Sequence, residues 1–344
     1  MRKKNFIAIF LVVFTMMLSS FAFYTYQILY TPNVLIEEDD RYFAIPKGTT
    51  FKQLQNKLAE ERIVNELVSF SFLAKLKDLD TQVKAGMYLI KGDMTNLELI
   101  NLLRSGSQTP IKLTFSNARL LNQLPKILTY GLAIDSADLA TILLHDTTAQ
   151  YYGFNKETFI SMFIPNTYEV YWTSTPKGLL DRMKAEYDRF WNEERLQKAK
   201  NLNMTPAQVS TLASIVLGET NKMDEAPTIA GVYINRLQRR IPLQADPTLV
   251  FAIGDFSIRR ILNKDKEFDS PYNTYKNRGL PPGPINLPSI PALNAVLNYE
   301  DHNYLYFCAK ADFSGYHAFA KTLTEHNKNA RKFQRALNME RIYR

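Results

Sequence analysis

A single glutamate at the end of an apolar helical stripe is the residue best placed to do acid-base chemistry. Val209, Leu212, Ala213 and Val216 recur at the three- and four-residue steps that put side chains on one face of a helix. Glu219 extends this stripe, since it lies about 20° from Leu212 around the helix axis. Its carboxyl group is therefore expected at the end of an apolar face rather than among solvated side chains.

A carboxyl group in that position is suited to proton transfer. Partial removal from water raises the pKa of a carboxyl, so Glu219 can stay protonated near neutral pH, as a general acid must. Gly218 beside it has no side chain, which would let a substrate approach. The alternative is that Glu219 is a surface residue of a fraying helix end, where the helix dipole disfavours an anion.

Two consecutive helices are expected to position this glutamate. Thr205, Pro206 and Gln208 form a helix start, with a hydroxyl cap, a proline that needs no amide partner and a capping-box glutamine. The next helix is predicted to begin with Asp224 as its cap and Pro227 in its first turn, with three residues facing inward: Ile229, Val232 and Tyr233.

The chain around these helices alternates between strand-like and helix-like stretches from Ile111 onward. Thr175 and Pro176 open a long amphipathic helix, and loops dominate after residue 243. The aromatic runs 304–308 and 315–319 predict two buried strands, with the lone Cys308 as a buried core thiol.

Composition limits the kind of partner. The 344 residues are 46% hydrophobic and 22% charged, which is typical of a globular protein. A net charge of +8 favours an anionic partner, such as nucleic acid, acidic lipid or a polymer that carries carboxylates. No RNP, zinc-finger or helix-turn-helix pattern is present, so nucleic acid is not expected. The four histidines lack metal-ligand spacing and no phosphate-binding glycine loop occurs, so neither a metal nor a cofactor is expected.

The N-terminal segment reads as a membrane anchor. Arg2, Lys3 and Lys4 precede an uncharged stretch from Asn5 to Ile36, whose densest apolar part (residues 6–23) is long enough to cross ~30 Å of hydrocarbon. The cationic start predicts a cytoplasmic N-terminus, with the body on the extracytoplasmic or periplasmic side of the inner membrane. A cleaved signal peptide is the alternative, because residues 20–22 loosely imitate a cleavage site.

Residues 42–91 form a predicted compact unit of strand, helix, helix and strand. This order is similar to that of a LysM module, a fold often used to hold sugar polymers, although the similarity is one of pattern only. The run from Ser105 to Pro110 is the best linker in the chain. We therefore expect an anchor over residues 1–36, a LysM-like module over 37–108 and a mixed α+β catalytic domain over 109–344, with Glu219 on a central helix.

Several motifs together resemble the endolytic murein transglycosylase (YceG-like) family. They occur in the family's order and lie at residues 212–220, 232–237, 243–248, 272–275, 279–283 and 326–327. The resemblance implies a membrane-anchored lyase that cuts nascent peptidoglycan strands internally and accompanies cell-wall synthases. It also implies that Glu219 is the catalytic acid. The chain departs from the family at Leu217, where a first glutamate is usual, and at Asn166, where an aspartate is usual.

The chemistry implied by the resemblance needs one glutamic acid and no water. The acid protonates the oxygen between N-acetylmuramic acid (MurNAc) and N-acetylglucosamine (GlcNAc), and the sugar's own C6 hydroxyl then closes a 1,6-anhydro ring. Two other functions stay open: a hydrolase (muramidase) that uses Asp246 as a second carboxylate, and a non-catalytic wall-binding scaffold.

Polar residues after the two helices are candidates for substrate binding. We expect Gln244 and Asp246, together with Tyr272, Asn273 and Thr274, to face the substrate, because such side chains can hydrogen-bond N-acetyl and hydroxyl groups. A simple turn at Asp246 and a self-packed loop at 272–274 are equally open. Asn235 and Arg236 are expected to pair with acidic neighbours, and the His326–Asn327 pair is expected to fix a loop at the cleft edge.

Overall fold

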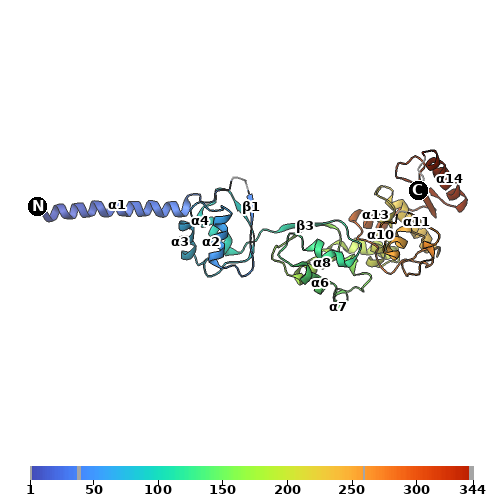
Figure 1. The fold of residues 1–344 in the computed structure, drawn as a ribbon, viewed down its shortest axis with the longest axis horizontal. Helices are drawn as coiled ribbons and strands as arrows, with labels where there is room; N and C mark the ends of the chain where they lie inside the picture. Colours follow the sequence, from blue (N-terminus) through green and yellow to red (C-terminus); the bar gives the residue numbers. More distant parts are fainter. Residues whose placement is uncertain (1, 37–39, 259, 341–344) are drawn as a thin grey trace. The chain divides into compact units, whose positions relative to one another are not determined.

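The chain divides into two compact units. A computed structural model describes residues 2–36, 40–258 and 260–340 (Figure 1). Unit 1 comprises residues 1–112 with the short segments 131–134 and 169–174, and unit 2 comprises the remainder. The fold is mixed α and β, as predicted, and within the described residues its strands pair in three two-stranded sheets.

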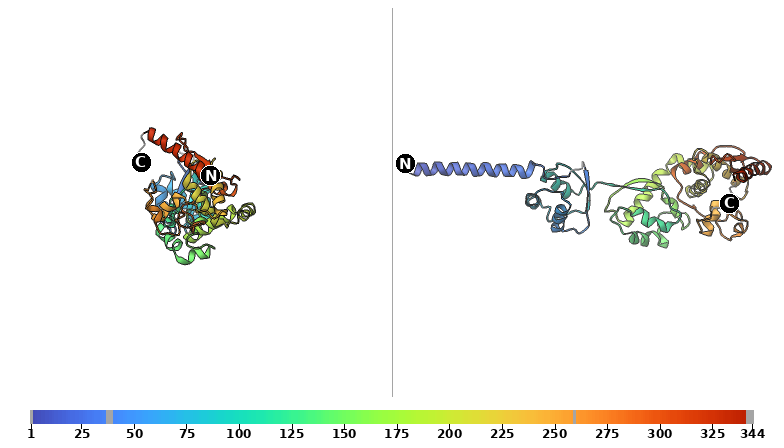
Figure 2. Two further views of the ribbon diagram at one scale, coloured as in Figure 1. Left: turned by 90° about the vertical axis from the view of Figure 1, so that its right-hand side faces the viewer. Right: turned by 45° about the horizontal axis from the view of Figure 1, so that its top comes forward.

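Unit 1 begins with a long apolar helix, α1 (Arg2–Tyr30), which leads into a small module (Figures 1 and 2). In the described part of the chain, α1 is the one helix that is long and apolar enough to cross a membrane, over Lys3–Tyr30. The large apolar side chains of this helix, such as Phe6 and Phe21, are exposed. An apolar helix whose large side chains are exposed matches the composition of the predicted anchor.

The module contains the predicted order of strand, helix, helix and strand. Its elements are β1 (Asp40–Ile45), α2 (Phe51–Glu60), α3 (Leu67–Leu76), β2 (Gly86–Lys91) and α4 (Asn96–Ser105). β1 and β2 pair antiparallel, with Tyr42 opposite Leu89. The capping boxes of Thr50 with Gln53 and Thr95 with Glu98 start α2 and α4. The relation to LysM modules remains a prediction.

The end of α1 is built into the core of this module. Ile28 and Leu29 pack against its buried hydrophobic cluster, to which Val34 also belongs. Asn33 and Asn96 are buried and bonded to each other at 2.7 Å, and Asn96 also donates to the Ile28 carbonyl. The helix and the module are therefore joined by packing and hydrogen bonds as well as by the chain.

Unit 2 is mainly helical. Its helices are η1 (Leu121–Gln123), α5 (Leu124–Leu128), α6 (Ser136–Leu143), α7 (Asp146–Tyr151), η2 (Phe159–Met162), α8 (Pro176–Phe190), α9 (Glu193–Asn201), α10 (Pro206–Glu219), α11 (Ala226–Gln238), α12 (Asp246–Ile253), η3 (Asp265–Glu267), α13 (Ile290–Leu297) and α14 (Leu323–Met339). β3 (Ile111–Phe115) pairs with β4 (Asn166–Val170), and β5 (Tyr306–Ala309) pairs antiparallel with β6 (His317–Ala320).

Helix α10 is buried more completely than its sequence predicts. The predicted capping box of Thr205 and Gln208 begins it, and it packs against α11, α12 and α13. Every residue from Val209 to Val216 is buried, not only one stripe. The small polar residues between the apolar ones make this possible, because Ser214 donates to the Thr211 carbonyl and accepts from the Ile285 amide.

Three local predictions were wrong. Neither the run 304–308 nor the run 315–319 forms a buried strand, because β5 begins at Tyr306, β6 begins at His317, and the residues of both strands except Ala320 are only partly buried. Cys308 is likewise partly exposed and lines a cavity, so it is not a core thiol. Helix α11 begins at Ala226, with Glu225 rather than Asp224 as the N-cap.

Candidate active site

Glu219 is the last residue of α10, and its side chain is partly buried. Tyr233 on α11 donates a hydrogen bond from its hydroxyl to Oε1 of Glu219 at 2.6 Å. Tyr233 is itself 2% exposed, so the packing of α11 against α10 fixes the position of the Glu219 carboxyl. The remaining surface of Glu219 opens into two cavities.

Burial gives Glu219 the protonation behaviour of a general acid. Desolvation is the largest effect and, helped by the negative charge of Asp246, raises the pKa of Glu219 to about 7. The hydrogen bond from Tyr233 and the positive charge of Arg236 act in the opposite direction. A large fraction of Glu219 is therefore neutral near pH 7, where an ordinary glutamate is ionised.

The two cavities share Glu219 and Asp246 in their linings. The first, of ≈ 280 Å³, is otherwise lined by residues that include Arg119, Phe251 and Asn286. The second, of ≈ 400 Å³, is otherwise lined by residues that include Tyr306, His317 and His326. Cavities of this size suit small ligand groups such as sugar rings. A chain-like ligand could therefore occupy both cavities with its middle at Glu219.

Asp246 is held at the junction of these cavities. It is the first residue of α12, it is exposed, and it accepts a short hydrogen bond from the Tyr275 hydroxyl. Asp246 was expected either to face the substrate or to form a simple turn, and its place in the lining of both cavities agrees with the first alternative. Gly218 contributes by its lack of a side chain, since a Cβ atom there would lie 2.8 Å from Cβ of Pro247. Close approach of α10 and α12 thus depends on Gly218.

Gln244 also faces a cavity. It is exposed, lines the second cavity, and has a left-handed backbone with a φ of 51°. Its amide nitrogen donates to the Thr274 carbonyl at 3.0 Å, which fixes the loop before α12. Its side-chain Oε1 accepts a hydrogen bond from Nη1 of Arg236 at 3.4 Å, so part of the side chain is already bound within the protein.

Asn273 and Thr274 do not face the substrate, contrary to expectation. They are 0% and 1% exposed. Asn273 donates to the carbonyls of Lys266 and Phe268, and the Thr274 hydroxyl accepts from the Ala245 amide. Their polar groups are used inside the protein, where they hold the loops that carry Gln244, Asp246 and Tyr275.

Tyr272 is neither open to a cavity, as Gln244 and Asp246 are, nor fully buried, as Asn273 and Thr274 are. It is partly buried and packs on Phe251 of the first cavity, with a ring separation of 4.8 Å. Its neighbour Tyr275 lines the second cavity, although the sequence did not single it out. The Tyr-Asn-Thr-Tyr run supplied a signal for Tyr275, because its fourth residue is polar and aromatic like its first.

Asn235 and Arg236 were expected to pair with acidic neighbours, but neither does so in the part of the chain that the structure describes. Asn235 donates to the carbonyls of His302 and Tyr304. Arg236 is 8% exposed and donates to the carbonyls of Leu305 and Leu243, at 2.7 and 2.8 Å. Arg236 therefore ties β5 and the 243 loop to α11 while its charge acts on Glu219 at a distance.

His326 lies on helix α14 and lines the second cavity rather than fixing a loop. Its ring stacks on Tyr306 at 5.4 Å, and burial together with the charge of Arg236 lowers its pKa. In the described part of the chain its Nδ1 atom is buried without a hydrogen-bond partner. Asn286 offers a similar group in the first cavity, where Oδ1 is buried and unpaired while Nδ2 donates to the Ser214 carbonyl. A bound ligand could satisfy both atoms.

The comparison with solved structures gives a relative with a similar fold. A crystal structure of a yceG-like protein from Listeria monocytogenes matches with a TM-score of 0.54 and 29% sequence identity, and the match covers 84% of this chain and 98% of that one.

Curated relatives carry the name endolytic murein transglycosylase. One from Streptococcus pneumoniae is 29% identical over 367 residues, covering 95% of this chain, and one from Bacillus subtilis is 29% identical over 306 residues, covering 84% of this chain and 83% of its own. This chain spans only 64% of the length of the pneumococcal relative.

The family-level match covers both units. The model of the YceG-like family matches residues 43–332, which includes the module, Glu219, both cavities and most of α14. The resemblance found in the sequence motifs is thereby confirmed, and this chain belongs to the YceG-like family.

Proposed function

We propose that this protein is a membrane-anchored endolytic transglycosylase of peptidoglycan, which cuts the β-1,4 bond between MurNAc and GlcNAc and leaves 1,6-anhydroMurNAc ends. The observation that carries this proposal is a glutamate with a pKa raised to about 7, placed where two cavities meet. The names of the curated relatives support it independently.

Glu219 would act first as acid and then as base. Its proton passes to the glycosidic oxygen as the bond from C1 of MurNAc to that oxygen breaks. The C6 hydroxyl oxygen of the same sugar then bonds to C1, and its proton returns to the Glu219 carboxylate. The acid is regenerated and no water is consumed, so a single carboxyl with a raised pKa is sufficient.

The open geometry supports cleavage within a strand. Glu219 and Asp246 line both cavities, so sugars on either side of the cleaved bond have space. Gln244 and Asp246 would contact the strand directly, while Tyr272 would shape the first cavity through Phe251. Asn273 and Thr274 would act only through the loops that they hold.

Asp246 is the reason to keep hydrolysis as a second candidate. A glycosidase needs two carboxylates at the scissile bond, and Asp246 is the second carboxylate that reaches both cavities. In the transglycosylase, the negative charge of Asp246 would instead help to keep Glu219 protonated and would stabilise positive charge on the sugar.

Helix α1 supports a location at the cytoplasmic membrane. Its apolar length allows a single span, and the basic residues at its start favour a cytoplasmic N-terminus, with the module and unit 2 outside. Cell-wall synthases, which release nascent strands at that surface, would be its natural neighbours.

Mass spectrometry of product ends tests the proposal. Purified wild type and Glu219→Gln are incubated with nascent glycan strands. We expect anhydroMurNAc ends from wild type and a loss of at least ~1000-fold in rate for the variant, because the proton donor is gone. Reducing MurNAc ends would favour hydrolysis, and full activity of the variant would favour a non-catalytic scaffold.

A further inference from the structure

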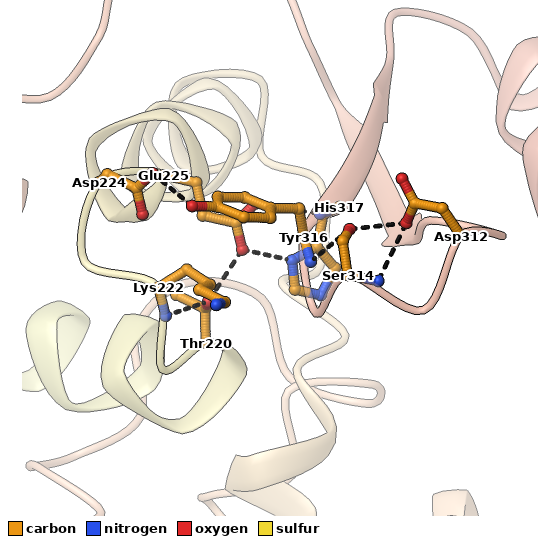
Figure 3. A network of polar contacts seen from close by, with 8 residues as sticks. All are labelled: Thr220, Lys222, Asp224, Glu225, Asp312, Ser314, Tyr316 and His317. Atoms are coloured by element: carbon orange, nitrogen blue, oxygen red, sulfur yellow. Dashed lines mark hydrogen bonds and ion pairs between the residues drawn. The ribbon is translucent and has the colours of Figure 1, made fainter.

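A buried polar network borders the second cavity through His317. Figure 3 shows it where the loop after α10, the start of α11 and strand β6 meet, with Thr220, Glu225 and His317 at its centre. Glu225 is 7% exposed and Thr220 is 5% exposed. The activity proposed above does not use this network.

Glu225 holds the imidazole of His317 from two directions. Its Oε1 accepts from Nδ1 of His317 at 2.7 Å and from the Thr220 hydroxyl at 2.8 Å. Its Oε2 accepts from the backbone amide of His317 at 3.0 Å. Contacts to both the backbone and the ring of one residue leave the imidazole little freedom to rotate, and the bond to the carboxylate places a proton on Nδ1.

The other ring nitrogen of His317 is left for the cavity. His317 lines the second cavity, together with Glu219 and Tyr233. Among the described residues its Nε2 makes no hydrogen bond, and it is not one of the buried unpaired atoms. The ring of Phe307 packs nearly perpendicular to the rings of both His317 and Tyr233. Phe307 therefore supports the imidazole next to Tyr233, which binds Glu219.

Glu225 is nearly buried, and its carboxyl contacts Nδ1 of His317 at 2.7 Å. With Nδ1 bound to Glu225, Nε2 is the ring nitrogen that remains for a ligand. Nε2 accepts a hydrogen bond when the ring is neutral and donates one when the ring is protonated.

We propose that His317 is a substrate-binding residue of the second cavity, with Glu225 as its positioning residue. Nε2 of His317 forms a hydrogen bond with a polar group of the glycan strand, either on a sugar or on a peptide stem. This inference rests on the proposed function, because it assigns a contact for the same substrate.

The test compares three variants of the full chain in detergent. His317→Ala should raise KM for glycan strands about tenfold, the effect of one lost hydrogen bond, with kcat changed much less. His317→Gln should recover part of the loss, because its side-chain amide can also form a hydrogen bond with the strand. Tyr316→Phe is the matched control, since Tyr316 bonds Asp224 and does not line the second cavity. It should leave KM unchanged.

Two strand preparations identify the group that His317 binds. A KM increase that persists on strands stripped of peptide points to the sugar, and one that disappears points to the stem. A KM equal to wild type in both His317 variants would overturn the inference, as would equal binding of strands by Glu219→Gln with and without His317→Ala. Absence of anhydroMurNAc ends from wild type would instead overturn the proposed function.

A second inference concerns an exposed apolar stripe on α3. Val68, Phe72 and Leu76 lie four residues apart, on one face of the helix, and are 72%, 57% and 65% exposed. The opposite face, with Phe70 and Leu73, is buried in the module core. Monomeric proteins rarely expose such a stripe without a partner.

Helix α3 packs beside the end of α1. Its buried Ser69 accepts a hydrogen bond from Asn96, which also donates to the Ile28 carbonyl of α1. Figure 1 shows α3 on the side of the module from which α1 emerges. The exposed Lys75 and the partly buried Lys77 lie on either side of Leu76 at the end of the stripe, and basic residues are typical of helices that lie in a lipid headgroup layer.

We infer that α3 lies on the surface of the membrane that α1 spans, with Val68, Phe72 and Leu76 in the lipid. This inference also rests on the proposed anchoring. It is tested by a spin label at residue 72, in a Cys308→Ser background, with the full chain in anionic lipid vesicles. Residue 42, on β1 at the other side of the module in Figure 1, is the control.

The label at residue 72 should be accessible to oxygen and shielded from a water-soluble nickel complex, and the label at residue 42 should show the reverse. Equal exposure of both labels to the nickel complex, in protein that floats with the vesicles, would overturn the inference. Protein that does not float would instead contradict the anchoring.

Discussion

At the scale of single residues, the hydrogen bond from Tyr233 to Glu219 should influence the pH range of the proposed activity. This bond favours the ionised carboxyl and so lowers the pKa of Glu219, against the larger effect of burial. The proposed mechanism requires the protonated form, which is lost as the pH rises through the pKa. In Tyr233→Phe the pKa of Glu219 should rise, and the alkaline limb of kcat/KM should move to higher pH. An alkaline limb unchanged from wild type would show that another group controls it.

The same carboxyl should make the protein less stable at alkaline pH. Because the pKa of Glu219 is raised from 4.5 to about 7 on folding, the neutral form is favoured in the folded state. Ionisation of Glu219 therefore lowers the free energy of unfolding from about pH 4.5 upward, and this loss grows until about pH 7 and is constant at higher pH. At pH 8, the free energy of unfolding of Glu219→Gln should therefore exceed that of wild type by about 1–3 kcal/mol, and the variant should melt at a higher temperature.

Thermal melts of wild type and Glu219→Gln at pH 4 and pH 8 provide the measurement. The gain should be small at pH 4, because Glu219 is then protonated in both states. Gln can still accept the hydrogen bond from Tyr233, so that contact is matched between the two proteins. A gain of the same size at both pH values would indicate that packing, not ionisation, causes it.

At the scale of elements, the contact between α10 and α12 places the two carboxyls of the site. A Cβ atom on Gly218 would lie 2.8 Å from Cβ and 3.0 Å from Cγ of Pro247, so α12 must shift in Gly218→Ala. The shift moves Asp246 away from Glu219. Overpacking of this kind costs about 1–3 kcal/mol, and a displacement of about 1 Å in a site lowers kcat by about ten- to a hundredfold.

A second glycine substitution serves as the control for this prediction. Gly178 of α8 is exposed, and the nearest atom to an added Cβ would be the hydroxyl of its own cap, Thr175, at 3.1 Å. Gly178→Ala should keep wild-type kcat and melting temperature. Equal kcat values for Gly218→Ala and wild type would show that α12 can move without disturbing the reaction.

The elements themselves were largely predictable, whereas the contacts between them were not. Local sequence signals correctly predicted three helices. These signals are the Thr205 capping box for α10, the Thr175–Pro176 start for α8 and the long apolar run for α1. Asn273 and Thr274 were misjudged, because a polar residue in a loop reads alike whether it faces a ligand or satisfies buried backbone groups. His317 and Tyr233 were missed as site residues for a related reason. Their roles depend on partners, Glu225 and Glu219, that only the folded chain brings within hydrogen-bonding distance.

At the scale of the whole molecule, the anchor and the module behave as one folded unit. Val34 is fully buried in the module core, Asn33 is bonded to Asn96 and to the carbonyl of Glu66, and Ile28 packs on the same core. All of these residues follow the most apolar part of α1. The position of a truncation should therefore decide whether removal of the anchor also destabilises the module.

Two truncations separate these effects. A chain that begins at residue 25 keeps Ile28, Asn33 and Val34, so its module should melt like that of the full chain. A chain that begins at residue 37 loses them, and the module should lose about 2–4 kcal/mol of unfolding free energy from the buried valine and the broken hydrogen bonds. Hydrogen exchange at the β1 and β2 amides measures this difference. Both truncations should cut soluble strands with the kcat of the full chain, because every residue that lines the two cavities belongs to unit 2. Equal protection of β1 and β2 in the two truncations would mean that the anchor is only tethered to the module.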